Sequence, residues 1–300
     1  MTRALPVISH SEQHGNLMQR QPLTTTHPHG YVLARPDRAL GLIRISKNAS
    51  TESKVRLECE DWLPFHEFGG PVVAFLREPV ARFLSSVPET ILRMTDFASA
   101  QEWRMDRVVI PDDVHLELLD VAKAPIPTVL ERFVELVEYA FFDAHHEPQH
   151  AFLADRHMAL RIDPYLYLTE TFETAIGQIE NRFGIDVPPA AQRGNVGGRK
   201  AEAGRNGLVD VARRVSSTGV YREVTNPGFL GRRYGDGQPV LLRELNGYCN
   251  KFVRELKSQD LPADLRQRIC DLYAFDLALW QDVTSRGGDV RASDVWPRND

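Results

Sequence analysis

Two short segments of the chain carry residue types that are suited to binding a phosphate group. The first, RISKNAST at 44–51, places Lys47 in a turn of small residues after an apolar run. The second, FLREPVARFLSS at 75–86, places Arg77 at the end of an apolar run and Ser85 in the segment that follows. Backbone N–H groups at a strand-to-helix turn, joined by an ammonium or a guanidinium group, bind anions well. The two segments therefore predict an anion site.

Neither segment is decisive alone. A loop of the form GxxxxGK[ST] is absent, because no glycine lies between Gly41 and Gly69, and this disfavours a Walker-type nucleoside triphosphatase. Read separately, SKNAST is also compatible with a plain turn, and Arg77 with an exposed arginine. The pairing favours a site, since parallel strands deliver both segments to the same edge of a sheet.

The elements that carry these residues alternate between strand and helix. Apolar runs at 39–45 and 71–76 predict buried strands, and a further strand is expected within 158–170. Thr171 and Gly184 suit the N-cap and C-cap of one helix. Helices are expected at 51–63, 79–94, 127–142, 171–184 and 262–283. The alternation predicts an α/β fold, with a central parallel β-sheet flanked by helices in a single domain.

The bulk composition limits the range of functions. The 300 residues carry a formal net charge of -5, which gives no overall signature of a nucleic-acid partner. Three scattered cysteines without metal-ligand spacing indicate a reducing compartment, with neither a disulfide framework nor a metal site. No apolar run approaches the roughly 20 residues of a membrane span. We expect a cytoplasmic protein with a flexible arm at 1–30 and one domain at 31–300.

The two segments, in this order, resemble the cofactor-binding motifs of sulfotransferases that use 3'-phosphoadenosine-5'-phosphosulfate (PAPS), particularly the carbohydrate sulfotransferases. FDAHHEPQHAFL at 142–153 is similar to an Asp, His, Pro and Gln segment of that group, and LYAFDLALW at 272–280 resembles its Tyr-x-x-Asp helix. The resemblance implies a P-loop-like nucleotide-binding fold. It also implies transfer of a sulfuryl group from PAPS, as co-substrate and without a metal, to a hydroxyl of a carbohydrate, glycolipid or small metabolite.

The resemblance implies a role for each matching residue. Lys47 would stabilise the charge that develops on the bridging oxygen when the sulfuryl group leaves the 5'-phosphate. Arg77 and Ser85 would hold the 3'-phosphate, for which a guanidinium fork suits better than an ammonium. Arg199, in the basic loop at 191–207, would close over the nucleotide. The residues that would form the 5'-phosphate loop are Asn48, Ala49, Ser50 and Thr51.

The base that takes the proton of the acceptor hydroxyl is left open. His145 aligns with the histidine of the family segment, and His146 beside it replaces a residue that is often aromatic there. Histidine has an unperturbed pKa near neutrality, which suits this role. The structural alternative is a helix-end histidine that interacts with the helix dipole. Further candidate bases are Glu52, His66, Glu67 and Glu89.

Two other functions stay open. A phosphoryl transferase with an atypical phosphate loop would need carboxylates for Mg²⁺, and no strand-end aspartate with that role is evident. A catalytically inactive relative would bind a nucleotide or a glycan without transfer. The chain also departs from secretory members of the family, because it shows neither a membrane anchor nor paired cysteines. This departure favours a soluble enzyme.

Overall fold

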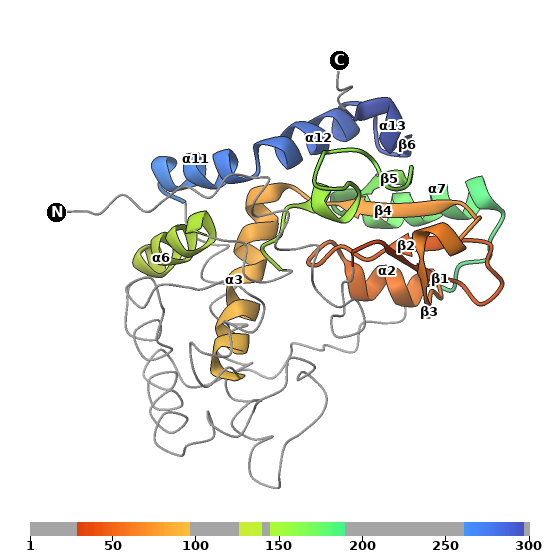
Figure 1. Ribbon diagram of the computed structural model, residues 1–300, viewed down its shortest axis with the longest axis horizontal. Helices are drawn as coiled ribbons and strands as arrows, with labels where there is room; N and C mark the ends of the chain where they lie inside the picture. Colours follow the sequence, from red (N-terminus) through yellow and green to blue (C-terminus); the bar gives the residue numbers. More distant parts are fainter. Residues whose placement is uncertain (1–28, 97–125, 140–144, 190–260, 297–300) are drawn as a thin grey trace, which may run out of the picture. The chain divides into compact units, whose positions relative to one another are not determined.

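The computed structural model describes residues 29–96, 126–139, 145–189 and 261–296, which are coloured in Figure 1. These residues fall into two compact units. The sheet unit comprises 29–82, 147–189 and 270–296, and the helical unit comprises 83–96, 126–139, 145–146 and 261–269. None of the described helices is long and apolar enough to cross a membrane.

A six-stranded sheet forms the centre of the sheet unit, in the order β3-β1-β2-β4-β5-β6. The strands are β1 (Tyr31–Ala34), β2 (Gly41–Ile43), β3 (Asp61–Pro64), β4 (Val72–Leu76), β5 (Tyr165–Leu168) and β6 (Val290–Arg291). β2, β4 and β5 run parallel, whereas β1, β3 and β6 pair antiparallel with their neighbours. The predicted α/β class is confirmed. The parallel arrangement holds for the three central strands, and the sheet as a whole is mixed.

Helices cover both faces of this sheet. Alternate residues of β4 point to opposite sides, so that Val72, Ala74 and Leu76 join one buried cluster and Val73 and Phe75 join the other. The first cluster includes residues of α12 (Ala274–Ser285), α13 (Ala292–Val295) and the 3-10 turn η4 (Gln149–Phe152). The second includes residues of α7 (Phe172–Phe183), together with Leu57 and Cys59, which follow α2 (Ser50–Arg56). The sheet unit is therefore a three-layer arrangement.

Two predicted helices are wrong in extent. The helix predicted at 51–63 ends at Arg56, because Glu58 adopts a left-handed conformation with φ 51° and residues 61–64 pair with β1 as β3. The helix predicted at 262–283 is two helices, α11 (Ala263–Leu272) and α12, because Tyr273 leaves the helical region with φ -117° and ψ 31°. Backbone pairing and this local break outweigh the apparent helical spacing.

Other predicted elements match closely. α7 ends at Gly184, whose φ of 62° is the conformation expected of a glycine C-cap, although Thr171 makes no side-chain capping hydrogen bond. α3 (Pro79–Asp96) follows β4 as predicted, and α6 (Ile126–Tyr139) corresponds to the helix predicted at 127–142. Residues 1–28, and the loop at 191–207 with Arg199, lie outside the described residues.

The helical unit has its own buried side chains. Phe83 and Val87 of α3 and Phe133 and Val137 of α6 are all at most 1% exposed. Arg268 of α11 donates to the carboxylate of Glu138 on α6, with Nη2 at 2.7 Å from Oε2. The apolar stripe of the helix predicted at 127–142 is therefore its buried face.

Candidate functional site

The carboxyl ends of the three parallel strands bring the predicted lysine and arginine together. Lys47 lies in the loop that follows β2, and Arg77 directly follows β4. The guanidinium of Arg77 donates from Nη1 to the backbone carbonyl of Lys47 over 3.1 Å. Glu170, after β5, accepts a hydrogen bond at 2.8 Å from the N–H of Glu78. Segments from all three strands thus meet at the edge where open α/β sheets bind ligands.

The Lys47 loop, residues 44–49, has an unusual backbone. Lys47 and Ala49 have φ angles of 63° and 52°, so two residues with a Cβ occupy the left-handed region on either side of Asn48. Each such residue costs about 1–2 kcal/mol. Left-handed residues within a turn allow backbone N–H groups to point into one concave space, where they bind anions. The strain therefore indicates a loop whose shape is imposed by its surroundings.

Asn48 provides part of that constraint. Its side chain is 2% exposed, and Nδ2 donates to the backbone carbonyl of Phe75 in β4 over 2.7 Å. The same Nδ2 donates to Oε1 of Gln149. Asn48 was expected in the phosphate-binding loop, and its amide faces the protein interior, where it ties the loop to β4.

Arg82 provides the other part. This residue is the more distant arginine of FLREPVARFLSS, and the structure buries it completely, with 2% exposure. Its Nε donates to the carbonyl of Ser46 at 3.0 Å, and its Nη1 donates to the carbonyl of Glu147 at 2.6 Å. Burial lowers the pKa of Arg82, while the negative charges nearby, including Asp276 and Glu147, oppose this shift. Arg82 therefore fixes the Lys47 loop from the protein interior, through the carbonyl of Ser46.

Gln149 connects the two predicted phosphate-binding segments. Its Oε1 accepts from the backbone N–H of Arg77 at 2.9 Å, and its Nε2 donates to the carbonyl of Arg77 at 2.9 Å. The residue lies in the segment DAHHEPQH, which the sequence associates with a base rather than with the loop. The one sequence feature that could have indicated this role of Gln149 is the run of polar residues in the middle of an otherwise apolar region.

Asp276 fixes this segment from α12. Its carboxylate accepts hydrogen bonds from the backbone N–H groups of Gln149 and His150, and Oδ1 lies 2.7 Å from Nδ1 of His150. Burial by itself would raise the pKa of Asp276, but His150 and the two backbone donors outweigh it and hold the pKa below its ordinary value. The aspartate of the Tyr-x-x-Asp helix therefore has a direct structural role.

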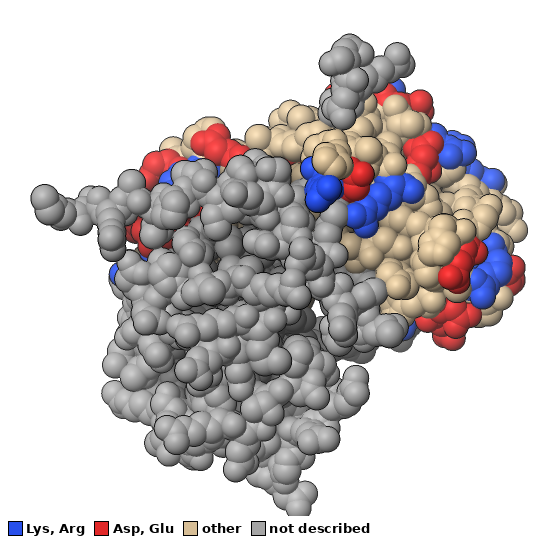
Figure 2. Space-filling view, in the orientation of Figure 1, with Lys and Arg blue, Asp and Glu red and all other residues tan. Residues whose placement is uncertain are grey.

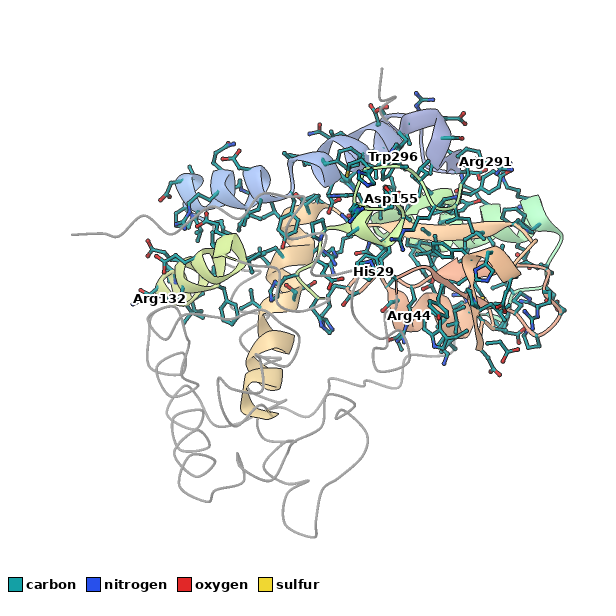
Figure 3. All side chains as sticks on the ribbon, viewed as in Figure 1. His29, Arg44, Arg132, Asp155, Arg291 and Trp296 are labelled. Carbon is teal, nitrogen blue, oxygen red and sulfur yellow. The ribbon has the colours of Figure 1, made fainter. Side chains whose placement is uncertain are left out.

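His29 makes a second contact with the same segment. His29 is labelled in Figure 3. Its Nε2 lies 2.6 Å from Oε2 of Glu147, its Nδ1 lies 2.8 Å from the carbonyl of Ala151, and its ring stacks on Phe152 with centroids 4.5 Å apart. Both side chains of the His29–Glu147 pair are nearly buried, at 9% and 1% exposure. The segment 147–152 is thus packed against His29, two residues before β1 begins.

The predicted catalytic histidines lie in the helical unit. His145 is 5% exposed and His146 is fully buried, with Nδ1 of His146 2.9 Å from Oγ of Ser86. The His146 ring packs against Phe83 and Phe133, with centroids 5.6 Å and 6.2 Å away. This packing is that of a core histidine, which differs from the helix-end histidine considered as the structural alternative. A catalytic role for either histidine stays a prediction.

The remaining predicted residues are placed as follows. Ser85 is half-buried on α3 in the helical unit, so a site shared with Arg77 stays a prediction. Ser50 and Thr51 open α2, where Ser50 is half-buried and Thr51 exposed, and Glu52 lies in the same turn. His66 and Glu67 form an exposed pair, with Nε2 3.6 Å from Oε1. Glu89 lies on α3.

The electrostatics of the sheet unit are local. Burial lowers the pKa of Arg77, while Glu170 and Glu78 oppose this shift, and the guanidinium stays charged at neutral pH. On the face of the described residues seen in Figure 2, basic and acidic side chains are interspersed rather than gathered into a patch of one sign. An anion would therefore be attracted by individual groups such as Lys47 and Arg77.

The arrangement can bind an anion at the end of β2 and β4 with a strained loop, a lysine and a partly buried arginine. The loop is held by its own residue Asn48 and by two neighbours, Arg82 and Gln149. Among family models, curated proteins and solved structures, no match to this chain was found.

Proposed function

We propose that this protein is a PAPS-dependent sulfotransferase that acts on a hydroxyl of a carbohydrate, glycolipid or small metabolite. The observation that carries the proposal is the 3.1 Å hydrogen bond from Arg77 Nη1 to the carbonyl of Lys47. This contact makes the two motif segments neighbours at the carboxyl edge of parallel strands. The two residues are 30 positions apart in sequence, and a nucleotide that carries a 3'- and a 5'-phosphate on one ribose needs them side by side.

The donor set of the sheet unit fits a phosphosulfate group. The first N–H groups of α2 have no acceptor within the helix, as at any helix start. Lys47 contributes an ammonium and Ser50 a hydroxyl, and Ser46 has a buried Oγ without a hydrogen-bond partner among the described residues. Arg77 contributes a charged fork for a second phosphate. Such donors favour a ligand with several anionic oxygens.

Each residue then has one task in the transfer. PAPS supplies a sulfuryl group on a phosphate leaving group. Lys47 stabilises the negative charge that the 5'-phosphate gains as the sulfur–oxygen bond to it breaks and the acceptor oxygen bonds to sulfur. Arg77, with Ser85, holds the 3'-phosphate and so orients the nucleotide. His145 or His146 takes the proton of the acceptor hydroxyl.

The proposal is tested by calorimetric titration of the protein with 3'-phosphoadenosine-5'-phosphate (PAP), the desulfated product. We expect wild type to bind PAP, and Lys47→Ala and Arg77→Ala each to bind about 10- to 100-fold more weakly, because each removes a charge-assisted hydrogen bond to a phosphate. The matched controls are Lys54→Ala on α2 and Arg291→Ala in β6, which pairs with the amino-terminal end of β5. The proposal would be contradicted if wild type did not bind PAP, or if the controls lost as much PAP affinity as the site variants.

A further inference from the structure

We propose that Gln149 is a positioning residue that sets the distance between the Lys47 loop and Arg77. The inference rests on the proposed function, because it treats these two elements as the holders of the two phosphates. Gln149 is 1% exposed, and its single side-chain amide contacts both elements. It bonds Asn48 Nδ2 on one side, and both the N–H and the carbonyl of Arg77 on the other.

The contact with Arg77 imitates a neighbouring strand. β4 ends at Leu76, and the amide of Gln149 then exchanges two hydrogen bonds of 2.9 Å with the next residue, as a paired backbone would. The side chain of Arg77 therefore extends from a backbone whose N–H and carbonyl are both fixed by hydrogen bonds. Because the guanidinium of Arg77 also reaches the Lys47 carbonyl, the position of the Arg77 backbone affects that contact too.

Only one orientation of the Gln149 amide satisfies all three partners. Oε1 accepts from two donors, Asn48 Nδ2 and the Arg77 N–H, while Nε2 donates to the Arg77 carbonyl. Turning the amide over would place its NH₂ group against those two donors and its oxygen against the carbonyl. The amide is therefore locked, and a shift of Gln149 must displace the loop and Arg77 together.

Gln149 is itself anchored from a distant part of the chain. Its backbone N–H donates to Asp276 Oδ2, and the next backbone N–H, of His150, donates to Oδ1 of the same carboxylate. Asp276 is 1% exposed and belongs to α12, which packs on the sheet. The position of Gln149 is thus set by the sheet unit as a whole and not by the ligand-facing loop.

This arrangement predicts energetic coupling between the two phosphates of a bound nucleotide. When both holders are already at the right separation, the second phosphate binds without further ordering of the protein, and the affinity gain is large. When the separation is free to vary, each phosphate still binds its own holder, but the gain from having both is smaller. Loss of Gln149 should therefore weaken PAP more than it weakens a nucleotide with one phosphate.

The test compares the affinities of PAP, adenosine 5'-phosphate and adenosine 3'-phosphate in wild type and Gln149→Met. We expect the ratio of the PAP affinity to the affinity of either monophosphate to fall about tenfold, which corresponds to the loss of roughly one charge-assisted hydrogen bond. The affinities of the two monophosphates themselves should change less than threefold. Gln281→Met, on the exposed side of α12, is the matched control and should match wild type. Equal losses for all three nucleotides would indicate a general structural role and overturn the proposal.

Hydrogen exchange provides a readout that needs no ligand. We expect the backbone N–H of Arg77 to exchange faster in Gln149→Met, by more than the fall in global stability accounts for, and to stay protected in Gln149→Glu, which keeps both acceptor contacts of Oε1. Unaltered exchange at Arg77 in both variants refutes the positioning role even where PAP binds wild type. Failure of PAP to bind wild type refutes the proposed function instead. Gln149→Glu is the fallback variant if Gln149→Met does not fold, because its carboxylate cannot donate to the Arg77 carbonyl. An unaltered affinity advantage of PAP over the two monophosphates in Gln149→Glu would then overturn the inference.

Discussion

Asp276 should be among the most costly residues of the sheet unit to truncate. Asp276→Ala leaves three buried donors without their acceptor, namely the backbone N–H groups of Gln149 and His150 and Nδ1 of His150. Each buried donor that loses its partner costs about 1–3 kcal/mol, so we expect a loss of roughly 3–9 kcal/mol for the three donors. That amounts to a large part of the 5–15 kcal/mol by which a typical protein is stable.

The assay is urea unfolding at neutral pH, with Asp282→Ala, an exposed aspartate on the same helix, as the control. We expect the control to lie within about 0.5 kcal/mol of wild type. A loss below about 1 kcal/mol for Asp276→Ala would refute the reasoning, since it would mean that the three donors find other acceptors at no cost.

The same residue gives a pH dependence with a defined sign. Because the pKa of Asp276 is lowered in the folded state, its contribution is complete above the ordinary aspartate pKa of about 4 and is lost as the pH falls through the lower folded-state value. Wild type should therefore lose more stability than Asp276→Asn does when the pH is reduced below about 4. Parallel acid-unfolding curves for the two proteins would contradict this assignment.

Three further perturbations probe the loop and the core. Ala49→Gly should stabilise the protein by about 0.5–1 kcal/mol, because relief of the left-handed strain exceeds the added entropy of the unfolded glycine, and a lower unfolding midpoint in urea would contradict this. Arg82→Met should destabilise by about 3–6 kcal/mol in the same assay, since it removes two hydrogen bonds from a charged donor at about 1.5–3 kcal/mol each, and a change near zero would refute its holding role. Burial raises the pKa of the Cys59 thiol to about 12, so iodoacetamide at pH 8 should leave Cys59 unmodified until urea unfolds the chain; labelling of the folded protein, detected by peptide mass, would contradict that burial.

The meeting of Lys47 with Arg77 could be predicted from the sequence. It depends only on the alternation of strand and helix and on the rule that parallel strands end at the same edge, and both features are local or general. The same logic yields the α/β class and the helix that ends at Gly184. The antiparallel strands β1, β3 and β6 were not predicted, because Asp61–Pro64 follows on from the apparent helical spacing of the segment before it and β6 has only two residues.

The internal support of the site could not be predicted in the same way. Asn48 was recognised as a loop residue, but nothing local to SKNAST indicates that its amide turns inward to Phe75. Gln149 and Asp276 stood in weak motif segments, and their hydrogen bonds to one another depend on the tertiary arrangement. A side chain that hydrogen-bonds distant backbone groups creates no periodic pattern in the sequence, because the residues beside it need not follow any pattern.

The long separations within this network determine when the site can form during folding. Asn48 and Gln149 are 101 positions apart, and Gln149 and Asp276 are 127 positions apart. Loops of this length close slowly, and contacts between distant residues form late. During synthesis the Lys47 loop leaves the ribosome long before α12 exists to anchor Gln149. A chain shortened before Asp276 should therefore keep Lys47 and Arg77 and still lack the geometry that brings them together.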